Sequence, residues 1–331
     1  MQNLHLRLFV IFVGFGFLLT TAQVSAQVST ETPPSWKRAW SKTDFSKTSV
    51  DFDEIISGGP PKDGIPSIDN PRFMAAGEIR ENDLASTEPV IGVVIDGKAR
   101  AYPLRVLTWH EIVNDSFNGV PITITYCPLC NSSIVFDRRL DGKLLDFGTT
   151  GKLRNSDMVM YDRQTESWWQ QFLGEGIVGE MTGKRLKVLP SRLESFANFR
   201  KRAPNGEVLI PNDPGMRQYG VNPYTGYDTA SMPFLFMGEL PDYINPMVRV
   251  VVAEGKAWAL PFLVKKGKVT DGDLSLTWAA GQNSALDERR IRNGRDVGNV
   301  IVQRKGQDVV YDMTFAFVYN AFYKGKRIVT E

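Results

Sequence analysis

The chain has 331 residues, with 39 lysines and arginines against 37 acidic residues and a formal net charge of +2 at pH 7. This balanced charge gives no electrostatic basis for binding nucleic acid or an anionic membrane. The length is sufficient to bury one or two ordinary hydrophobic cores, and the two cysteines allow at most one disulfide, which excludes a small disulfide-stapled fold.

The first 26 residues have the pattern of a secretory signal peptide. Arg7 supplies a positive charge, residues 8–19 form an apolar or glycine run, and Ala26 closes a small-residue cleavage site. A membrane anchor is the alternative, but the run is shorter than the roughly 20 apolar residues of a spanning helix. We therefore expect cleavage after Ala26, a periplasmic or secreted protein, and no membrane span in the mature chain. His110 is then the one histidine that remains.

Strands dominate the part of the chain that follows. Residues 27–70 are expected to form an N-terminal extension, with a glycine- and proline-rich loop over 58–66. From residue 89 onward, short apolar or alternating runs predict strands, and the Asp-Gly pair at 96–97 predicts a β-hairpin. A short helix is expected over 104–113, which includes His110.

A helix and a long connector over 191–245 separate this part from the end of the chain. A capping box at 191–194 predicts a helix that ends at the Pro-Asn-Gly of 204–206. The residues that follow are dense in proline, glycine and tyrosine, and irregular loops of this length usually cover something. Packing on the surface is the simpler interpretation, and a lid over the cysteine loop is the alternative.

Two parts of the chain resemble each other in the same order. The matching segments are 97–103 with 255–261, 122–133 with 274–285, and 160–162 with 310–312. Self-similarity of this kind indicates a repeated structural unit. We therefore predict a mainly β fold with a few short helices, made of two tandem, diverged copies of one β-rich unit that pack together, at 71–190 and 246–331.

The second copy lacks the reactive side chains of the first. Ala279 and Gln282 stand where the first copy has Cys127 and Cys130. The Lys-Lys-Gly-Lys sequence at 265–268 stands where the first copy has the His110 helix, so we expect that helix to be missing. The joint loss of two thiols and one imidazole favours a shared site in the first copy.

Cys127 and Cys130 follow a predicted strand in a Cys-Pro-Leu-Cys loop, and several chemistries compete for them. A structural disulfide suits an oxidising compartment, although it would close only a very small loop. Thiol–disulfide exchange usually uses a helix N-terminus to lower the pKa of the first thiol, but a turn and a strand are predicted after Cys130. A cysteine nucleophile with His110 as its base would tend to be oxidised by the second cysteine outside the cytoplasm.

A metal site is the interpretation that uses Cys127, Cys130 and His110 together. Two thiolates and one imidazole suit copper or zinc, and copper(I) is favoured because it tolerates three soft ligands. Zinc would need a further ligand, either water or one of the carboxylates Glu111, Asp115, Asp137 and Asp162. The residues expected to support the site are Glu111, Asp162, Tyr126 and Asn131.

Five strings of the sequence have a familiar form. They are Gly-Ile-Pro-Ser-Ile-Asp-Asn-Pro at 64–71, Ala-Tyr-Pro at 101–103, His-Glu-Ile-Val-Asn-Asp at 110–115, Tyr-Cys-Pro-Leu-Cys at 126–130 and Met-Tyr-Asp-Arg at 160–163. With these strings the chain resembles the uncharacterised prokaryotic family catalogued as domain of unknown function 3179, over roughly residues 50–320. The resemblance implies export, in agreement with the signal pattern, and implies no particular activity.

The sequence thus predicts an exported protein that binds copper or zinc through Cys127, Cys130 and His110, for delivery, storage or sensing. A metal-accepting or redox protein is the expected partner, and nucleic acid is not expected. The alternatives are a periplasmic thiol–disulfide redox protein that uses the same two cysteines, or a structural disulfide in an interaction protein. The sequence leaves open whether the protein is an enzyme.

Overall fold

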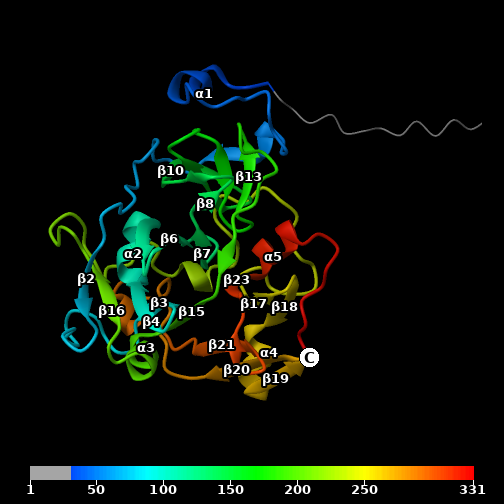
Figure 1. Cartoon of the computed structure of the whole chain (residues 1–331). Coiled ribbons are helices and arrows are strands. Elements are labelled where there is room, and N and C mark those ends of the chain that lie inside the picture. Colours follow the sequence, from blue (N-terminus) through cyan, green and yellow to red (C-terminus); the bar gives the residue numbers. More distant parts are fainter. Residues whose placement is uncertain (1–30) are drawn as a thin grey trace, which may run out of the picture.

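The computed structural model describes residues 31–331, so the predicted signal peptide lies outside the described residues. The fold is mainly β with five short helices in this part of the chain, and five of its sheets form the blades of a propeller-like ring (Figure 1). The prediction of a mainly β protein with a few short helices is therefore confirmed. None of the helices within 31–331 has the length and apolar character needed to cross a membrane.

The strands are grouped into blades as follows, in order across each sheet. Blade 1 contains β1 (Ile55–Ser57), β10 (Phe147–Arg154), β11 (Asp157–Asp162), β12 (Trp168–Gln170) and β13 (Glu175–Val178). Blade 2 contains β14 (Val188–Leu189), β7 (Ser132–Asp137), β6 (Val120–Cys127) and β5 (Ile112–Phe117). Blade 3 contains β15 (Ser191–Ser195), β3 (Pro89–Ile95), β4 (Lys98–Pro103), β16 (Glu207–Ile210) and β2 (Arg72–Ala75).

The last two blades come from the end of the chain. Blade 4 contains β18 (Lys256–Ala259), β17 (Arg249–Ala253) and β23 (Asp312–Phe315). Blade 5 contains β19 (Lys268–Asp271), β20 (Leu274–Ala279), β21 (Asn299–Arg304) and β22 (Gln307–Asp308). A separate two-stranded ribbon joins β8 (Arg139–Leu140) to β9 (Lys143–Leu144). The helices are α1 (Pro34–Ala39), α2 (Leu104–His110), α3 (Phe196–Arg202), α4 (Leu260–Lys266) and α5 (Ala316–Phe322).

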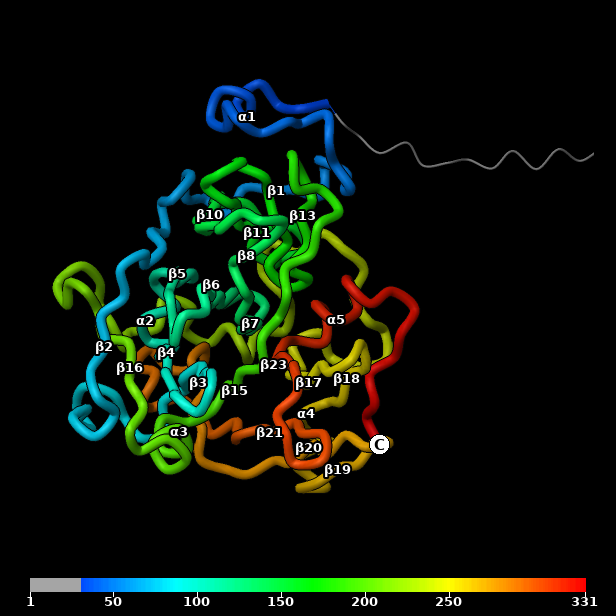
Figure 2. The backbone as a smooth tube through the Cα atoms, viewed as in Figure 1, coloured from blue at the N-terminus to red at the C-terminus, as the bar shows by residue number. Residues whose placement is uncertain are grey.

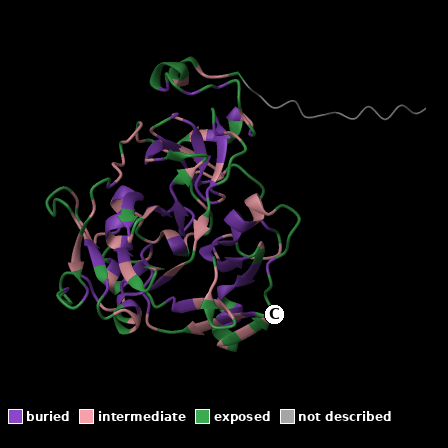
Figure 3. Ribbon diagram, viewed as in Figure 1, coloured by how far each residue is buried: buried purple, intermediate pink, exposed green. Residues whose placement is uncertain are grey.

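The cysteine loop lies inside a hydrophobic cluster to which blades 1, 2 and 4 contribute. Every residue of β7 and of β11 is buried, and the central strands stand out as buried in Figure 3. Phe147 of blade 1, Phe136 of blade 2 and Phe315 of blade 4 belong to the same cluster as Cys127 and Cys130. The two thiols are therefore enclosed by packed side chains rather than presented on the surface.

The N-terminal extension packs on blade 1. It runs from α1 across that blade and on to β2, as the tube in Figure 2 shows. The rings of Trp36 and Trp40 lie 4.8 and 5.3 Å from the ring of Trp168, centroid to centroid. Edge-on aromatic packing of this kind stabilises the contact beyond the area that it buries.

Two predicted helix boundaries differ from the structure. The helix expected over 104–113 ends at His110, because Glu111 adopts a positive φ of 58° and β5 then begins at Ile112. The capping box predicted at 191–194 is wrong, because these residues pair with β3 as strand β15. Ser195 is the actual cap of α3, and its hydroxyl accepts a hydrogen bond from the Asn198 amide at 3.3 Å.

Two stretches of the chain have the same order of elements. Strands β3 and β4, helix α2 and strands β5 and β6 are matched by β17, β18, α4, β19 and β20. The expectation that the second stretch lacks the helix is wrong, since α4 occupies Leu260–Lys266. Its residues Leu260, Phe262 and Leu263 are buried, and its two lysines fall in the last turn, where the helix dipole favours positive charge.

The two helices also end in the same way. The amide of Glu111 donates to the Leu107 carbonyl at 2.7 Å, and the Gly267 amide donates to Leu263 at 2.7 Å. The carbonyl of Glu111 accepts from the Tyr126 amide, and that of Gly267 accepts from Trp278, both at 2.8 Å. Both positions have positive φ, 58° for Glu111 and 68° for Gly267. A glutamate thus occupies a backbone conformation that normally favours glycine.

Candidate metal centre and its cavity

Strand β6 ends at Cys127, which pairs with Ser132 at the start of β7. A tight turn joins the two strands, with the Cys130 amide donating to the Cys127 carbonyl at 3.2 Å. Both cysteines are free thiols, and their side chains are buried. The cysteines thus lie at the end of a strand, as the sequence pattern predicts, and in the turn that leads to β7.

Strand β23 of blade 4 holds this turn in place. The hydroxyl of Thr314 donates to the Cys130 carbonyl at 2.8 Å, and the side-chain amide of Asn131 donates to the Met313 carbonyl at 3.0 Å. Asn131 has a φ of 52°, which asparagine tolerates better than most residues. Its observed contribution is to fix the shape of the loop.

A carboxylate that the sequence analysis did not single out completes the cluster. The sulfur atoms of Cys127 and Cys130 and a carboxylate oxygen of Asp157 all lie within 4.8 Å of one another. Asp157 is fully buried at the start of β11. Its Oδ2 accepts hydrogen bonds from Gln170 Nε2 at 2.6 Å and from the Phe172 amide at 2.9 Å, whereas Oδ1 has no partner in the described structure. An unpaired buried oxygen costs about 1–3 kcal/mol, so this one is suited to an additional ligand.

A signal for Asp157 does exist in the sequence. The match of 160–162 with 310–312 extends backward to pair Asp157 with Gln307. The carboxylate is thus absent from the second stretch together with the two thiols. The difference lies three residues upstream of the matched segment, outside the residues on which the predicted repeat rests.

Burial dominates the proton chemistry of the cluster. It raises the pKa of both the Cys127 and the Cys130 thiol above the usual value. It also raises the pKa of the Asp157 carboxyl to about 6. Both thiols are therefore protonated at neutral pH in the absence of a metal, and a bound cation would have to displace their protons.

The structure does not bring His110 into this cluster. One ring nitrogen, Nδ1, lies 2.7 Å from the Pro66 carbonyl oxygen, and Nε2 lies 2.7 Å from the Tyr219 hydroxyl. A carbonyl only accepts, so Nδ1 carries the proton and Nε2 accepts from the tyrosine. The imidazole thus lies between the loop at 64–71 and the connector, and both of its nitrogens are used by these two segments. The carboxylate of Asp157 thus stands in the group where the imidazole was expected.

Two of the four expected supporting residues, Asp162 and Tyr126, also lie outside the group formed by Cys127, Cys130 and Asp157. Asp162 is buried, and its carboxylate accepts from the Thr165 amide at 2.7 Å and from Trp169 Nε1 at 2.9 Å. It therefore organises the turn between β11 and β12. Tyr126 is buried beside Cys127, and its hydroxyl has no partner among the described residues.

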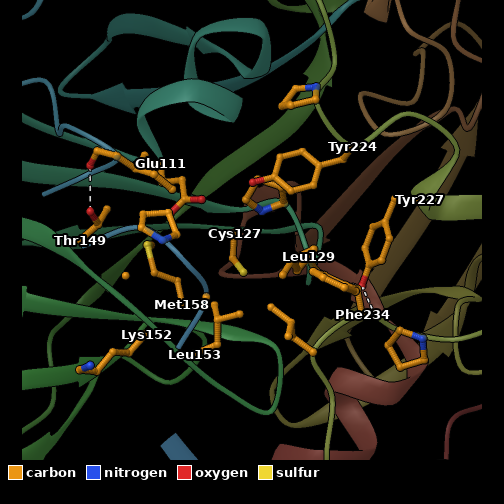
Figure 4. Close-up of a pocket in the computed structure, with 18 of the residues that line it drawn as sticks. Glu111, Cys127, Leu129, Thr149, Lys152, Leu153, Met158, Tyr224, Tyr227 and Phe234 are labelled. Atoms are coloured by element: carbon orange, nitrogen blue, oxygen red, sulfur yellow. Dashed lines mark hydrogen bonds between the residues drawn. The ribbon is translucent and has the colours of Figure 1, made fainter. Parts of the chain in front are cut away.

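A cavity of about 660 Å³ opens beside Cys127. Apolar side chains form much of its wall, and the connector contributes residues between 223 and 235 (Figure 4). The hydroxyl of Tyr227 donates to the Leu129 carbonyl at 3.0 Å, and the Ser156 hydroxyl donates to the Phe234 carbonyl. The connector is thus attached to a residue between the two cysteines and to the neighbour of Asp157. Of the two interpretations of the connector, the structure supports a cover over the cysteine loop.

Glu111 and Tyr224 point toward one another across this cavity, near Cys127 (Figure 4). Neither the carboxylate nor the hydroxyl has a hydrogen-bond or ion-pair partner within residues 31–331. Burial, followed by the charge of Asp157, raises the pKa of Glu111 to about 8. Convergent polar groups in a mostly apolar cavity are typical of a ligand site.

Asp312→Asn is expected to stabilise the metal-free protein at pH 8 by roughly 1–3 kcal/mol and to have little effect at pH 5. Asp312 is buried on β23, where Oδ1 accepts from the Ser133 and Met313 amides, both at 2.9 Å, and Oδ2 has no partner in the described structure. Burial raises the pKa of this carboxyl to about 7, above its unfolded value. The folded state therefore holds the proton more tightly, and this stabilisation is lost as the pH rises from about 4 through about 7.

Urea denaturation at the two pH values, in the presence of a chelator, measures this difference. Asparagine keeps the Oδ1 acceptor, so the two amide hydrogen bonds are retained in the variant. An equal change in stability at pH 5 and pH 8 would contradict the assignment of the raised pKa to Asp312.

Comparison with known proteins identifies one family. Neither the curated proteins nor the solved structures contain a match to the chain. The model of a family described as a protein of unknown function (DUF3179) matches residues 62–329. These residues include the cysteine loop, Glu111, Asp157 and the whole connector. The resemblance predicted from the five sequence strings is confirmed, and the chain belongs to the DUF3179 family.

Proposed function

We propose that the protein binds one zinc or copper ion through Cys127, Cys130 and Asp157. The observation that carries this proposal is the convergence of two sulfurs and one carboxylate oxygen within 4.8 Å. Metal bonds of about 2.0–2.3 Å place tetrahedral ligands roughly 3.3–3.8 Å apart, so only a modest contraction of the group is needed. Zinc is the better candidate of the two, because a carboxylate is a harder ligand than the imidazole that the sequence suggested.

The surroundings of Asp157 support this proposal. Its Oδ2 is oriented by Gln170 and by the Phe172 amide, as second-shell contacts orient the ligands of known metal sites. Its Oδ1 is buried and has no partner in the part of the chain that the structure describes. A cation bound there would satisfy this oxygen and would also neutralise the two thiolates.

Thiol–disulfide exchange is the second candidate function. It is favoured by the presence of two neighbouring free thiols, of which Cys127 lines the cavity and Cys130 does not. The raised pKa of each thiol counts against it, because exchange requires a thiolate and reactive cysteines have a lowered pKa. We therefore rank exchange below metal binding.

Export and internal duplication complete the proposal. The signal pattern and the family resemblance support export, and N-terminal sequencing of the exported protein should begin at Gln27. The matched order of elements supports two tandem copies of one unit. The same pair of backbone hydrogen bonds at the ends of α2 and α4, at Glu111 and Gly267, also supports them. A superposition of residues 89–127 on 249–279 that puts their strands out of register would argue against duplication.

Metal analysis of the purified mature protein tests the binding proposal. We expect about one zinc or copper ion per chain, and Cys127→Ser and Asp157→Asn should each lower the affinity for the ion by roughly tenfold or more. The same loss is expected in direct titration with zinc, after the protein has been treated with a chelator.

Two variants serve as controls for this experiment. Asp312→Asn changes another buried aspartate that lies outside the cluster, and it should retain the metal. His110→Gln should also retain it, because both ring nitrogens are used by Pro66 and Tyr219. A metal-free wild-type protein that does not bind added zinc or copper would refute the proposal, and loss of metal in His110→Gln alone would restore the imidazole as a ligand.

A further inference from the structure

We infer that the metal centre is catalytic, and that Glu111 is the acid–base residue for hydrolysis of an uncharged ester or amide that carries an apolar group. This inference rests on the proposed metal site and assigns it a reaction. Three observations carry it: the number and placement of the ligands, the backbone conformation of Glu111, and the chemistry of the cavity wall.

The ligand set leaves one coordination position open. Within residues 31–331, only Cys127, Cys130 and Asp157 form a group of potential ligands. Structural zinc sites have four protein ligands, whereas catalytic sites have three and hold water in the fourth position. Cys127 lines the cavity, as does Met158, the neighbour of Asp157, so the cluster lies directly beneath the cavity wall. A water molecule that reached a metal held there from the cavity would share that space with the Glu111 carboxylate.

Glu111 occupies a position where a glutamate is energetically unfavourable. Its φ of 58° is matched by 68° at Gly267, which has the same two backbone hydrogen bonds and open space where a side chain would begin. The fold therefore does not need a side chain at this position. Residues held in such conformations concentrate at functional sites. A buried carboxylate without a partner, aimed into a cavity, accounts for the retention of glutamate here.

The cavity wall indicates the class of substrate. Leu129, Leu153, Met158, Phe234 and Leu235 supply apolar surface. Lys152 also lines the cavity, but its ammonium group lies over the ring of Trp36 at 4.7 Å and points away from the other labelled side chains in Figure 4. No cation is thus directed at an anionic ligand by the described lining residues. A neutral, largely apolar molecule fits this wall.

The hydrolytic step uses water as its co-reactant. A metal held by Cys127, Cys130 and Asp157 would polarise a water molecule, and the Glu111 carboxylate would accept that water's proton as its oxygen attacks the acyl carbon. The Tyr224 hydroxyl is placed to donate a hydrogen bond to the carbonyl oxygen as negative charge develops there. The bond between the acyl carbon and the leaving oxygen or nitrogen then breaks, and Glu111 returns the proton to that atom. The products are a carboxylic acid and an alcohol or amine.

Cobalt(II) substitution tests whether the fourth position is open. We expect the visible spectrum of the cobalt-loaded mature protein to change when benzohydroxamate, which binds open metal positions, is added. Benzamide has the same ring without the chelating group and should cause no change. Cobalt binding without a response to benzohydroxamate would overturn the catalytic assignment and leave the metal proposal intact, whereas failure to bind cobalt or zinc would refute both.

Hydrolysis of p-nitrophenyl butyrate by the zinc-loaded protein tests the role of Glu111. Glu111→Gln should lower kcat/KM by about 10²–10⁴-fold while zinc stoichiometry is unchanged. Glu111→Gly should lose the same activity with an equal or higher urea midpoint, because glycine relieves the positive φ. Equal rates in wild type and Glu111→Gln, or no zinc-dependent hydrolysis by a protein that binds benzohydroxamate, would overturn the assignment.

Discussion

Asp228→Asn is expected to lower the free energy of unfolding by about 3–5 kcal/mol, because it leaves a buried arginine without its counter-charge. Asp228 lies in the 3-10 turn Tyr227–Thr229 of the connector, and its Oδ2 accepts from Arg249 Nη2 at 2.9 Å and from the Ser284 hydroxyl at 2.5 Å. The Asp228 side chain is fully buried, and only 5% of that of Arg249 is exposed. This ion pair connects the cover of the cavity to strand β17.

Urea denaturation of the variant measures the loss of stability. The control is Asp271→Asn, which removes an ion pair of equal length, 2.9 Å, between the exposed side chain of Lys256 and the partly exposed side chain of Asp271. Exposed pairs contribute about 0–1 kcal/mol, so the control should be nearly neutral. Alkylation of Cys127 should also be faster in Asp228→Asn, since Tyr227 lines the cavity next to the changed residue. Similar losses of stability in both variants would contradict the role assigned to the buried pair.

Trp168→Ala is expected to cost about 3–5 kcal/mol, the range for removal of a large buried aromatic side chain. Trp168 on β12 is completely buried. Its ring contacts the rings of Trp36, Trp40 and Phe45, with centroid distances of 4.8, 5.3 and 5.4 Å. The substitution removes the aromatic surface on which the N-terminal extension packs.

Limited proteolysis together with urea denaturation tests this prediction. We expect the variant to unfold at lower urea concentration and to be cleaved faster within residues 34–52 than the wild-type protein. Trp36→Ala is the control, because Trp36 is only half-buried and its removal leaves the rest of the aromatic cluster in place. Unchanged cleavage of the extension in Trp168→Ala would show that other contacts hold it on blade 1.

Much of the fold could be predicted from local patterns. The Asp-Gly pair at 96–97 forms the turn between β3 and β4, and the alternating run before Cys127 forms β6. The capping box at 191–194 failed because pairing with β3 outweighs a local helix signal. The helix at 260–266 was not predicted, because its lysines lack the imidazole of His110 and the loss of that side chain was equated with the loss of the helix. The helix depends instead on the burial of Leu260, Phe262 and Leu263. The closure of the sheets into a ring depends on contacts between distant strands, which local patterns do not encode.

The candidate site was predictable only in part. The two cysteines are close in sequence, so their proximity followed from a short loop between two strands. Asp157 lies on another blade, whereas His110 and Glu111 are neighbours at the end of α2. Sequence spacing does not reveal which of these three side chains lies next to the thiols. The backbone sets these directions. The last residue of α2, His110, is hydrogen-bonded to Pro66 and Tyr219, and the next residue, Glu111, has a positive φ.

X-ray absorption at the zinc edge of the metal-loaded mature protein tests the central claim most directly. Two sulfur neighbours at about 2.3 Å and oxygen neighbours at about 2.0–2.2 Å are expected, without the outer-shell scattering of an imidazole. A spectrum with an imidazole in the first shell, or with fewer than two sulfurs, would contradict a centre built from Cys127, Cys130 and Asp157.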